Sequence, residues 1–557
     1  MKLTKKFLSG LLCMIMVISL AACGGSDNSG TANNSQTEGA AAGQTAEGSD
    51  TNQAAAVYAE ELEPMEISIA IWGIQDAFDN ANAETDTIFN DLCEKFNITI
   101  KPVGVTWNDW QEKNKVWAAS GSLPDVFCDA NSSGNLGLYI TWAEQGVIKA
   151  IPSDLSAYPN LEQVFGWEAV KPLAINGTYY LVPRGNVYVS DSASSQGVSS
   201  MGRSIIYRKD WAEAAGYKEA PTTFDALVEM TKAMMEQHPG AVGIAVNNPD
   251  YMQAFATDIY PEIGSYSAWT FDEEQWKPTF ASEKTTAYIE RLQKLYKDGI
   301  LDPDFIIQKD GDGIGKFHSG NACVMLSNNI DPQVFMNANQ DVENIEDAIG
   351  FVLPFLAADG NYYVSAPGGY WSETYISAQV DDAKTERILM LLDYMYSYEY
   401  TSLVQNGIEG VDWEKTDKGN VSLLTDMTLE DKYPVTQTIG WLSSWQGGFS
   451  ADKVTNAIPV IAAYEKLYNE IDAIEKEMSL TGKPLATSFY IELMDNQEKI
   501  DVSGLTADFT AALNNIIISN EDPVTAWETM IKDFNAKGLN EAIESVTQQA
   551  LDEGIVQ

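Results

Sequence analysis

The sequence predicts an α/β fold with more than one lobe, and three features of the chain support this. Strand-like apolar segments alternate with amphipathic helical segments between residues 65 and 127, and again between residues 205 and 245. The 557 residues are 45% hydrophobic, which suffices for two or three domains of about 100–200 residues. The last third shows longer helical patterns. We therefore expect doubly wound α/β lobes completed by a largely helical C-terminal part.

The globular body opens with a β-α-β pattern. Residues 65–72 (MEISIAIW) and 98–103 are predicted strands, and residues 86–96 between them place apolar side chains at helical spacing. A helix is expected at residues 107–119 and a third strand at residues 124–127. Because helices connect these strands, the first sheet should be parallel.

Later segments repeat this pattern before the helices become longer. A helix is expected at residues 224–236, between two strand-like segments. The C-terminal helices are expected at residues 382–398, 454–478, 506–519 and 523–537.

The first 22 residues have the features of a secretory signal peptide. Lys2, Lys5 and Lys6 precede the apolar residues 7–20, which are too few to span a bilayer comfortably. The small residues before Cys23 resemble a lipobox, the cleavage site of bacterial lipoproteins. We expect cleavage before Cys23 and a lipid on its sulfur that holds the protein at the outer face of the cell membrane. The alternative is an ordinary signal followed by a chance cysteine.

Residues 24–56 lack Val, Ile, Leu, Met, aromatic, Lys and Arg residues, so they should bury nothing and stay disordered. A flexible segment of this length has a root-mean-square reach of about 30 Å. Residues 23–62 should therefore form a lipidated tether that lets the body move beside its anchor.

Charge and composition exclude several classes of function. The formal net charge of −46 repels phosphate backbones and anionic lipid headgroups, so we expect no nucleic acid partner and no direct binding to a membrane surface. The chain has two histidines, and its cysteines besides Cys13 of the leader and the proposed lipid site Cys23 are Cys93, Cys128 and Cys323. With no CxxC pair, we expect buried free thiols, no disulfide framework, no zinc site and no cofactor.

Sequence motifs for metal binding or catalysis are lacking. Residues 310–313 (DGDG) begin like a calcium loop, but Ile314 breaks the acidic pattern, so we expect a solvated loop and no metal. No GxSxG, HExxH or phosphate-binding loop occurs, and no catalytic residues are predicted. A glycoside hydrolase needs two carboxylates across a cleft, which an abundance of acidic residues does not by itself identify.

A series of short motifs follows one order along the body. They are residues 121–126 (GSLPDV), 142–146 (WAEQG), 151–155 (IPSDL), 176–184 (NGTYYLVPR), 206–211 (IYRKDW), 221–224 (PTTF), 317–322 (FHSGNA), 407–411 (GIEGV) and 522–527 (DPVTAW). In this order they resemble the family-1 extracellular solute-binding proteins, the sugar receptors of ABC importers. The resemblance implies a periplasmic-binding-protein-like fold, in which two α/β lobes joined by hinge crossings hold the ligand between them.

The resemblance also divides the chain. Lobe 1 is expected to hold residues 63–182 and about 376–440, and lobe 2 residues 183–375 and about 441–557. Crossings between the lobes are expected near residues 182–184, where a strand ends in Pro and Gly, near residues 367–375, and after Asn406.

Sugars present apolar faces and a fringe of hydroxyl groups, so aromatic and hydrogen-bonding side chains at strand ends and in loops are the candidate ligand contacts. Trp72 ends the first strand, and Asp129 and Asn131 follow the third, at the edge where doubly wound lobes bind ligands. Further candidates occupy Gly- or Ser-containing segments: Trp269, Tyr370, Trp371, Trp441 and Trp445. For each tryptophan, packing in a core is the alternative.

Arginine is rare, and Arg184, Arg203 and Arg208 lie close to the first expected crossing. Arg184 and Arg203 could orient ligand hydroxyls or a carboxylate through their planar forks of donors. Arg208 precedes Asp210, which we expect to cap a helix. Glu409 lies in a motif that resembles a family signature, and either a ligand contact or a structural role would explain it.

These features predict a carbohydrate receptor that captures an oligosaccharide between two lobes and delivers it to the membrane permease of an ABC importer. We expect a monomer without enzymatic activity, anchored at the extracytoplasmic face. One alternative is a receptor of the same fold for a peptide or another small solute. The other is a secreted glycoside hydrolase.

Overall fold

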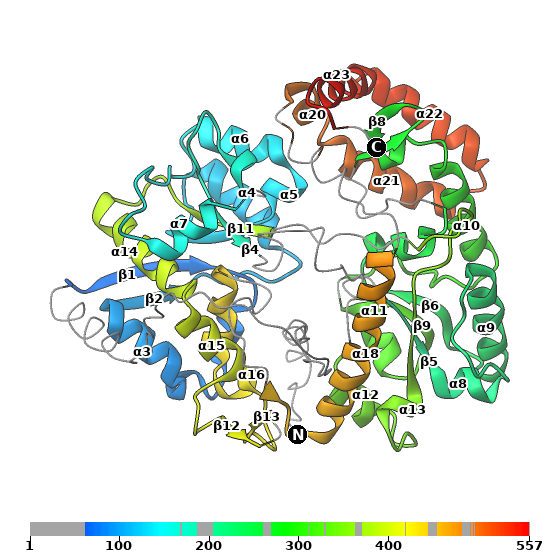
Figure 1. Cartoon of the computed structure of the whole chain (residues 1–557), viewed down its shortest axis with the longest axis horizontal. Helices are drawn as coiled ribbons and strands as arrows, with labels where there is room; N and C mark the ends of the chain where they lie inside the picture. The colour runs from blue at the N-terminus through cyan, green and yellow to red at the C-terminus, as the bar shows by residue number, and fades with distance from the viewer. Residues whose placement is uncertain are drawn as a thin grey trace, which may run out of the picture.

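The computed structural model describes residues 62–167, 170–185, 204–259, 269–309, 311–327, 330–362, 370–417, 419–443, 454–481, 491, 494 and 496–555. The expected signal peptide, Cys23 and the tether lie outside this part of the chain. The described residues form two lobes, each built on its own mixed β-sheet with helices packed around it (Figure 1). The two-lobed α/β fold predicted from the sequence is confirmed.

The first lobe, at the left of Figure 1, contains a five-stranded sheet in the order β2-β1-β3-β11-β4. Its strands are β1 (Met65–Ala70), β2 (Ile98–Pro102), β3 (Val126–Asp129), β4 (Val182–Gly185) and β11 (Tyr370–Ile376). β1 pairs in parallel with β2 and β3, as the β-α-β pattern predicts. β11 arrives from far along the chain and pairs antiparallel with both β3 and β4. The sheet is therefore mixed.

The helices of the first lobe come from both ends of its sequence. They are α2 (Ile74–Asp79), α3 (Thr87–Phe96), α4 (Trp110–Ser120), α5 (Asn131–Gly134), α6 (Leu136–Glu144), α7 (Pro159–Phe165), α14 (Asp382–Met395), α15 (Tyr398–Asn406), α16 (Leu429–Lys432) and α17 (Pro434–Ile439). The hairpin of β12 (Trp413–Thr416) and β13 (Gly419–Ser422) follows α15. The expected helix at residues 382–398 ends at Met395, and Ser397 caps the next helix.

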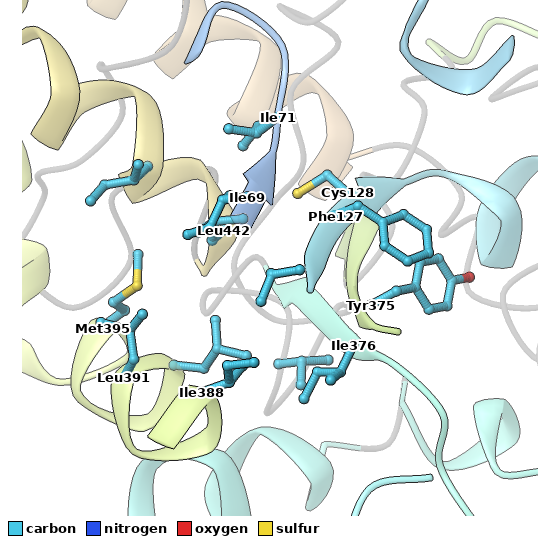
Figure 2. Packing of buried hydrophobic residues seen from close by; sticks show 14 of the residues in the cluster. Ile69, Ile71, Phe127, Cys128, Tyr375, Ile376, Ile388, Leu391, Met395 and Leu442 are labelled. Atoms are coloured by element: carbon cyan, nitrogen blue, oxygen red, sulfur yellow. The ribbon is translucent and has the colours of Figure 1, made fainter. Parts of the chain in front are cut away.

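The core of the first lobe lies between the sheet and helix α14. Figure 2 shows Ile388, Leu391 and Met395 of α14 pointing towards the strands. On the sheet, the ring of Phe127 in β3 stacks on that of Tyr375 in β11 at a centroid distance of 5.3 Å. This contact lets residues from the C-terminal half of the chain complete a core that the N-terminal half begins.

The second lobe is built on a four-stranded sheet in the order β10-β5-β9-β6. Its strands are β5 (Ser204–Arg208), β6 (Val242–Val246), β9 (Ala322–Ser327) and β10 (Ile349–Val352), and a separate hairpin joins β7 (Trp269–Asp272) to β8 (Gln275–Pro278). β9 pairs in parallel with β6 and antiparallel with β5. This sheet is mixed as well.

The C-terminal helices pack onto the second lobe (Figure 1). The helices of this lobe are α8 (Lys209–Ala214), α9 (Phe224–Gln237), α10 (Thr285–Lys297), α11 (Asp312–His318), α12 (Pro332–Ala338), α13 (Ile345–Ala348), α18 (Pro459–Thr481), α20 (Gln497–Asp501), α21 (Leu505–Ile518), α22 (Pro523–Asn535) and α23 (Leu539–Asp552). The expected helix at residues 454–478 begins only at Pro459, because Val454–Thr455 forms strand β14 against β13. None of the described helices combines the length and apolarity that crossing a bilayer requires.

The lobes have separate cores. The buried hydrophobic cluster of the first lobe contains no residue of the second, and the two clusters of the second lobe contain none of the first. The chain passes between the lobes after residue 185, before residue 370, and between β14 and α18. The first expected crossing, residues 182–184, lies within β4, so the passage comes later in the chain than predicted.

A buried carboxylate ties the early and late parts of the first lobe together. Asp86, with no exposed surface, caps α3 by accepting from the N–H of Phe89 at 3.0 Å. It also accepts from the N–H groups of Val435 and Thr436, at 3.0 and 2.8 Å, and from the Thr436 hydroxyl at 2.6 Å. One side chain therefore satisfies donors at the start of two helices that lie far apart in the sequence.

Replacement of Asp86 should destabilise the first lobe strongly. Asp86→Ala leaves several buried donors without an acceptor, so we expect the free energy of unfolding to fall by about 3 kcal/mol in urea titrations followed by circular dichroism. Asp91→Ala, on the exposed face of α3, is the matched control and should change little. Equal effects of the two substitutions would contradict this role for Asp86.

Candidate ligand site between the lobes

A cavity of about 640 Å³ lies between the two lobes and is lined by both. This volume is within the range of about 300–1,000 Å³ that is usual for small-molecule sites. Its lining residues from the first lobe are Thr106, Asn108 and Asp109, and those from the second are Asn247, Asn248, Pro249, Gln308 and Lys309. Most of them carry hydroxyl, amide or charged side chains, which are the groups that bind polar ligands.

The first lobe contributes the loop between β2 and α4. Within it, the Thr106 N–H donates to Asp109 Oδ1 at 2.7 Å, which closes a tight turn. The Asp109 carboxylate also lies 2.9 Å from the Lys113 ammonium, one turn further along α4. Slight burial opposes ionisation of Asp109, but the hydrogen bonds from Thr106 and Lys113 outweigh it and lower the pKa of this carboxyl. Asp109 is therefore ionised and paired.

The second lobe contributes the loop that follows β6 and the loop before α11. The buried Asn247 accepts from the Gly311 N–H through Oδ1 at 2.8 Å, which joins the two loops. α11 lies so close to the end of β6 that a Cβ on Gly313 would come within 2.4 Å of the Val246 carbonyl oxygen. Only glycine allows this approach. The cavity thus lies at the carboxyl ends of β2 and β6, the edge where open α/β sheets bind ligands.

A cluster of tryptophans packs next to the loop that the first lobe contributes to the cavity. The Trp72 ring lies edge-on to Trp107 and Trp110, with a centroid distance of 5.0 Å to each, and 6.0 Å from Trp441. Trp107 lies between two cavity-lining residues and is partly exposed. The guanidinium carbon of Arg184 lies 4.9 Å from the Trp72 ring centroid and 5.1 Å from that of Trp441, within cation–π range. The structure thus brings together Trp72, Trp441 and Arg184.

Arg184 is fully buried beside this cluster. Its guanidinium donates to the hydroxyl of Ser372, which has a left-handed backbone (φ 60°) where the pairing register of β11 shifts. Burial lowers the pKa of Arg184 to about 10, against the opposing effect of nearby Cys128, Tyr396 and Glu373, so the side chain is still charged at neutral pH. Arg184 therefore links the tryptophan cluster to the strand that returns from the second lobe.

Asp129 and Asn131 lie in a buried polar network. Asp129 accepts from Asn114 Nδ2 at 2.9 Å, and Glu373 of β11 accepts from the backbone N–H of Asn131 at 2.7 Å. Burial is the main cause that raises the pKa of Asp129 to about 6 and that of Glu373 to about 7. Asn131 Nδ2 is buried and has no hydrogen-bond partner among the described residues. The network joins β3, α4, α5 and β11 below the tryptophan cluster.

The other predicted contacts do not join this cluster. Trp269 is buried in the core of the second lobe, as part of the β7–β8 hairpin. Glu409 is exposed and forms an ion pair with Lys415 at 3.3 Å, in the turn before β12. Tyr370 and Trp371 form part of β11, but their side chains are not described, and Arg203 and Trp445 lie outside the described residues.

Two further expectations are wrong in detail. Asp210 does not cap α8 but lies in its first turn, where its carboxylate accepts from the buried Arg208 at 2.8 Å. Asp312 does not lie in a solvated loop but begins α11, and it accepts from the Lys309 N–H at 2.9 Å. In the described part of the chain, no group of three or more His, Cys, Asp or Glu side chains is arranged to hold a metal ion.

Trp107, Trp110 and the residues that line the cavity on the second lobe are not predicted from the sequence. Trp107 and Trp110 lay in a segment interpreted as one helix, whereas the helix begins at Trp110 and the preceding residues form the loop. Asn247 and Asn248 directly follow a predicted strand, and this position at a strand end is the feature that marks them as candidate ligand contacts.

The chain matches the model of the bacterial extracellular solute-binding proteins over residues 76–402. It belongs to this family. The members are binding proteins, so the chain is not an enzyme. A polygalacturonan/rhamnogalacturonan-binding protein of Bacillus subtilis (strain 168), YtcQ, is 25% identical over 426 residues, which cover 73% of this chain and 74% of the relative.

Solved structures share the fold over nearly their whole length. The FusA substrate-binding protein of an S. pneumoniae ABC transporter, in complex with kestose, aligns with a TM-score of 0.63, covering 88% of this chain and 99% of FusA at 16% identity. The alginate-binding protein AlgQ2 aligns with a TM-score of 0.62 at the same identity and coverage. These similarities support the two-lobed solute-binding fold.

The buried network should give the protein a characteristic pH dependence. Folding raises the pKa of Glu373 from 4.5 to about 7. Between these pH values the folded protein keeps the proton that the unfolded chain has lost. The free energy of unfolding therefore falls as the pH rises through this range. Relative to Glu373→Gln, the wild type should lose on the order of 2–3 kcal/mol of unfolding free energy between these pH values. Urea titrations at several pH values measure this difference. The exposed Glu229→Gln is the control, and parallel profiles for wild type and Glu373→Gln would contradict the assignment.

Proposed function

We propose that the chain is the extracellular oligosaccharide receptor of an ABC importer. The observation that carries this proposal is the cavity of about 640 Å³ to which both lobes contribute polar side chains. A ligand in this position contacts both lobes at once. It therefore favours the arrangement in which they are close together, in proportion to its additional contacts there.

The chemistry of the cavity suits a sugar. Amide groups of Asn108, Asn248 and Gln308 can donate to and accept from hydroxyl groups, and the Asp109 carboxylate can accept. Trp107, between the lining residues Thr106 and Asn108, is partly exposed and supplies an aromatic side chain beside the cavity. A hydrophobic peptide would find few apolar partners among the lining residues. The residues therefore favour a saccharide over a peptide.

The relatives point to the same ligand class. YtcQ is named for polygalacturonan and rhamnogalacturonan, FusA was solved with kestose, and the NgtS solute-binding protein of Streptococcus pneumoniae, with a TM-score of 0.53, was solved with Man5GlcNAc. These glycans differ in charge and linkage, so they support an oligosaccharide without selecting one. A receptor for a peptide or another small solute is the second candidate.

We also propose that the receptor is lipidated on Cys23 and presents its ligand to a permease in the same membrane. The support is the lipobox-like sequence and the apolar-free residues 24–56, which suit a tether. The ATPase of the importer would be a separate chain, because this sequence has no phosphate-binding loop.

Thermal unfolding with a panel of neutral and acidic oligosaccharides tests the proposal. A ligand that binds only the folded state must raise the midpoint, and the rise should grow with ligand concentration. A clear rise with one glycan class supports the receptor function. No rise across the panel, with a rise in a peptide library, would replace the saccharide by a peptide.

Trp107→Ala should weaken binding of the glycan identified in this way by about tenfold or more, because it removes the aromatic face at the border of the cavity. Isothermal titration calorimetry measures the dissociation constant. Trp117→Ala, a partly buried tryptophan on α4 outside the Trp72 cluster, is the matched control and should bind as the wild type does. Unchanged affinity in Trp107→Ala would remove the tryptophan cluster from the site.

Cys23→Ala should release the protein from the membrane. Without the acylated cysteine, only the tether and an acidic body remain, and neither binds anionic lipid. Fractionation of cells that express the two forms should show wild-type protein in membranes and the variant in the medium. Equal membrane retention would contradict lipid anchoring at this residue.

A further inference from the structure

We propose that Lys309 makes the cavity selective for oligosaccharides that carry a carboxylate, such as chains with uronic acid units. This inference rests on the proposed function and adds to it the chemical class of the ligand. Lys309 lines the cavity and is exposed. It belongs to the second lobe, opposite the tryptophan cluster of the first.

The charges of the cavity do not cancel. Among the described residues that line it, Asp109 and Lys309 carry a charge. Asp109 is already neutralised by Lys113, whose ammonium lies 2.9 Å away. The remaining lining groups are neutral amides, a hydroxyl and a proline. One lysine charge is therefore left over at the cavity.

Nearby acidic residues already have other partners. Asp302 and Asp304 form ion pairs with Lys316, at 2.6 and 3.4 Å. The Asp312 carboxylate accepts from the main-chain N–H of Lys309 at 2.9 Å, which fixes the backbone of the loop. Among the described residues, no carboxylate forms an ion pair with the Lys309 ammonium. Within the described part of the chain, the Lys309 ammonium thus has no ion-pair partner, in a protein with a formal net charge of −46.

The position of Lys309 makes its effect depend on the ligand. The overall negative charge repels any anion, so an anionic ligand needs a local cation to bind. A saccharide that contacts Thr106 and Asn108 of the first lobe occupies the same cavity as Lys309 of the second, whose long, flexible stem can reach a carboxylate on it. Pairing of this carboxylate with Lys309 adds an electrostatic attraction that a neutral sugar lacks. It also connects the lobes, which a neutral sugar would do less strongly.

The test compares acidic trisaccharides with their carboxyl-reduced counterparts, which keep the ring and linkage but lack the charge. Trigalacturonate, trimannuronate and the two reduced sugars are titrated calorimetrically into the full chain and into Lys309→Met, Lys309→Arg and Lys218→Met. Lys218 is an exposed lysine of the same lobe, away from the cavity lining. We expect at least one acid to bind about tenfold tighter than its reduced form, a preference lost in Lys309→Met and kept in Lys309→Arg and Lys218→Met.

The outcomes separate this inference from the function on which it rests. Three outcomes overturn the role of Lys309 and leave the oligosaccharide receptor intact. The wild type binds acid and reduced sugar equally, Lys309→Met weakens both equally, or only neutral glycans bind. If neither series nor any neutral oligosaccharide binds, the proposed function itself fails.

Discussion

The first lobe depends on one hydrogen-bonded junction, at which the segments that lead to and from the second lobe meet. Arg184, in β4, donates to Ser372 in β11, and the Tyr396 hydroxyl donates to the carbonyls of both Pro183 and Ser443. The chain leaves the first lobe after β4, returns to it at β11, and passes Ser443 before it leaves again. These hydrogen bonds hold the three described segments together on the first lobe.

The same junction supports the tryptophan side of the cavity. The Arg184 guanidinium lies over Trp72 and Trp441 while it binds β11, so a rotation of β11 would move the rings that border the ligand site. A buried cation is costly unless its donors and charge are matched, and aromatic faces with a hydroxyl acceptor provide part of that match. The buried hydrophobic clusters of the two lobes are separate, so no shared core joins them in the part of the chain that the structure describes. Through Arg184, strand β11 is therefore in contact with the tryptophans beside the cavity.

The sequence predicted those parts of the structure that depend on local patterns. Alternation in residues 65–72 and helical spacing in residues 86–96 identified the parallel opening, because one face of each element is buried. The sequence could not predict that β11 pairs with β3, since that register depends on contacts between distant segments. The role of glycine-containing segments could not be predicted for the same reason. The segment of Trp269 forms a buried hairpin, and that of Glu409 forms an exposed turn. Loop residues such as Asn247 have no periodicity that reveals them.

For the tryptophans, packing in a core and a place beside the ligand cavity do not exclude each other. Trp72 is 9% exposed and Trp110 is 6% exposed, so both pack as core residues do. Trp107 packs against Trp72 from the exposed side, next to residues that line the cavity. Substitution of the buried rings would change the position of the exposed one, and their effects on binding would not add. Trp72 thus supports Trp107, and the buried and the partly exposed ring form two layers of one cluster beside the cavity.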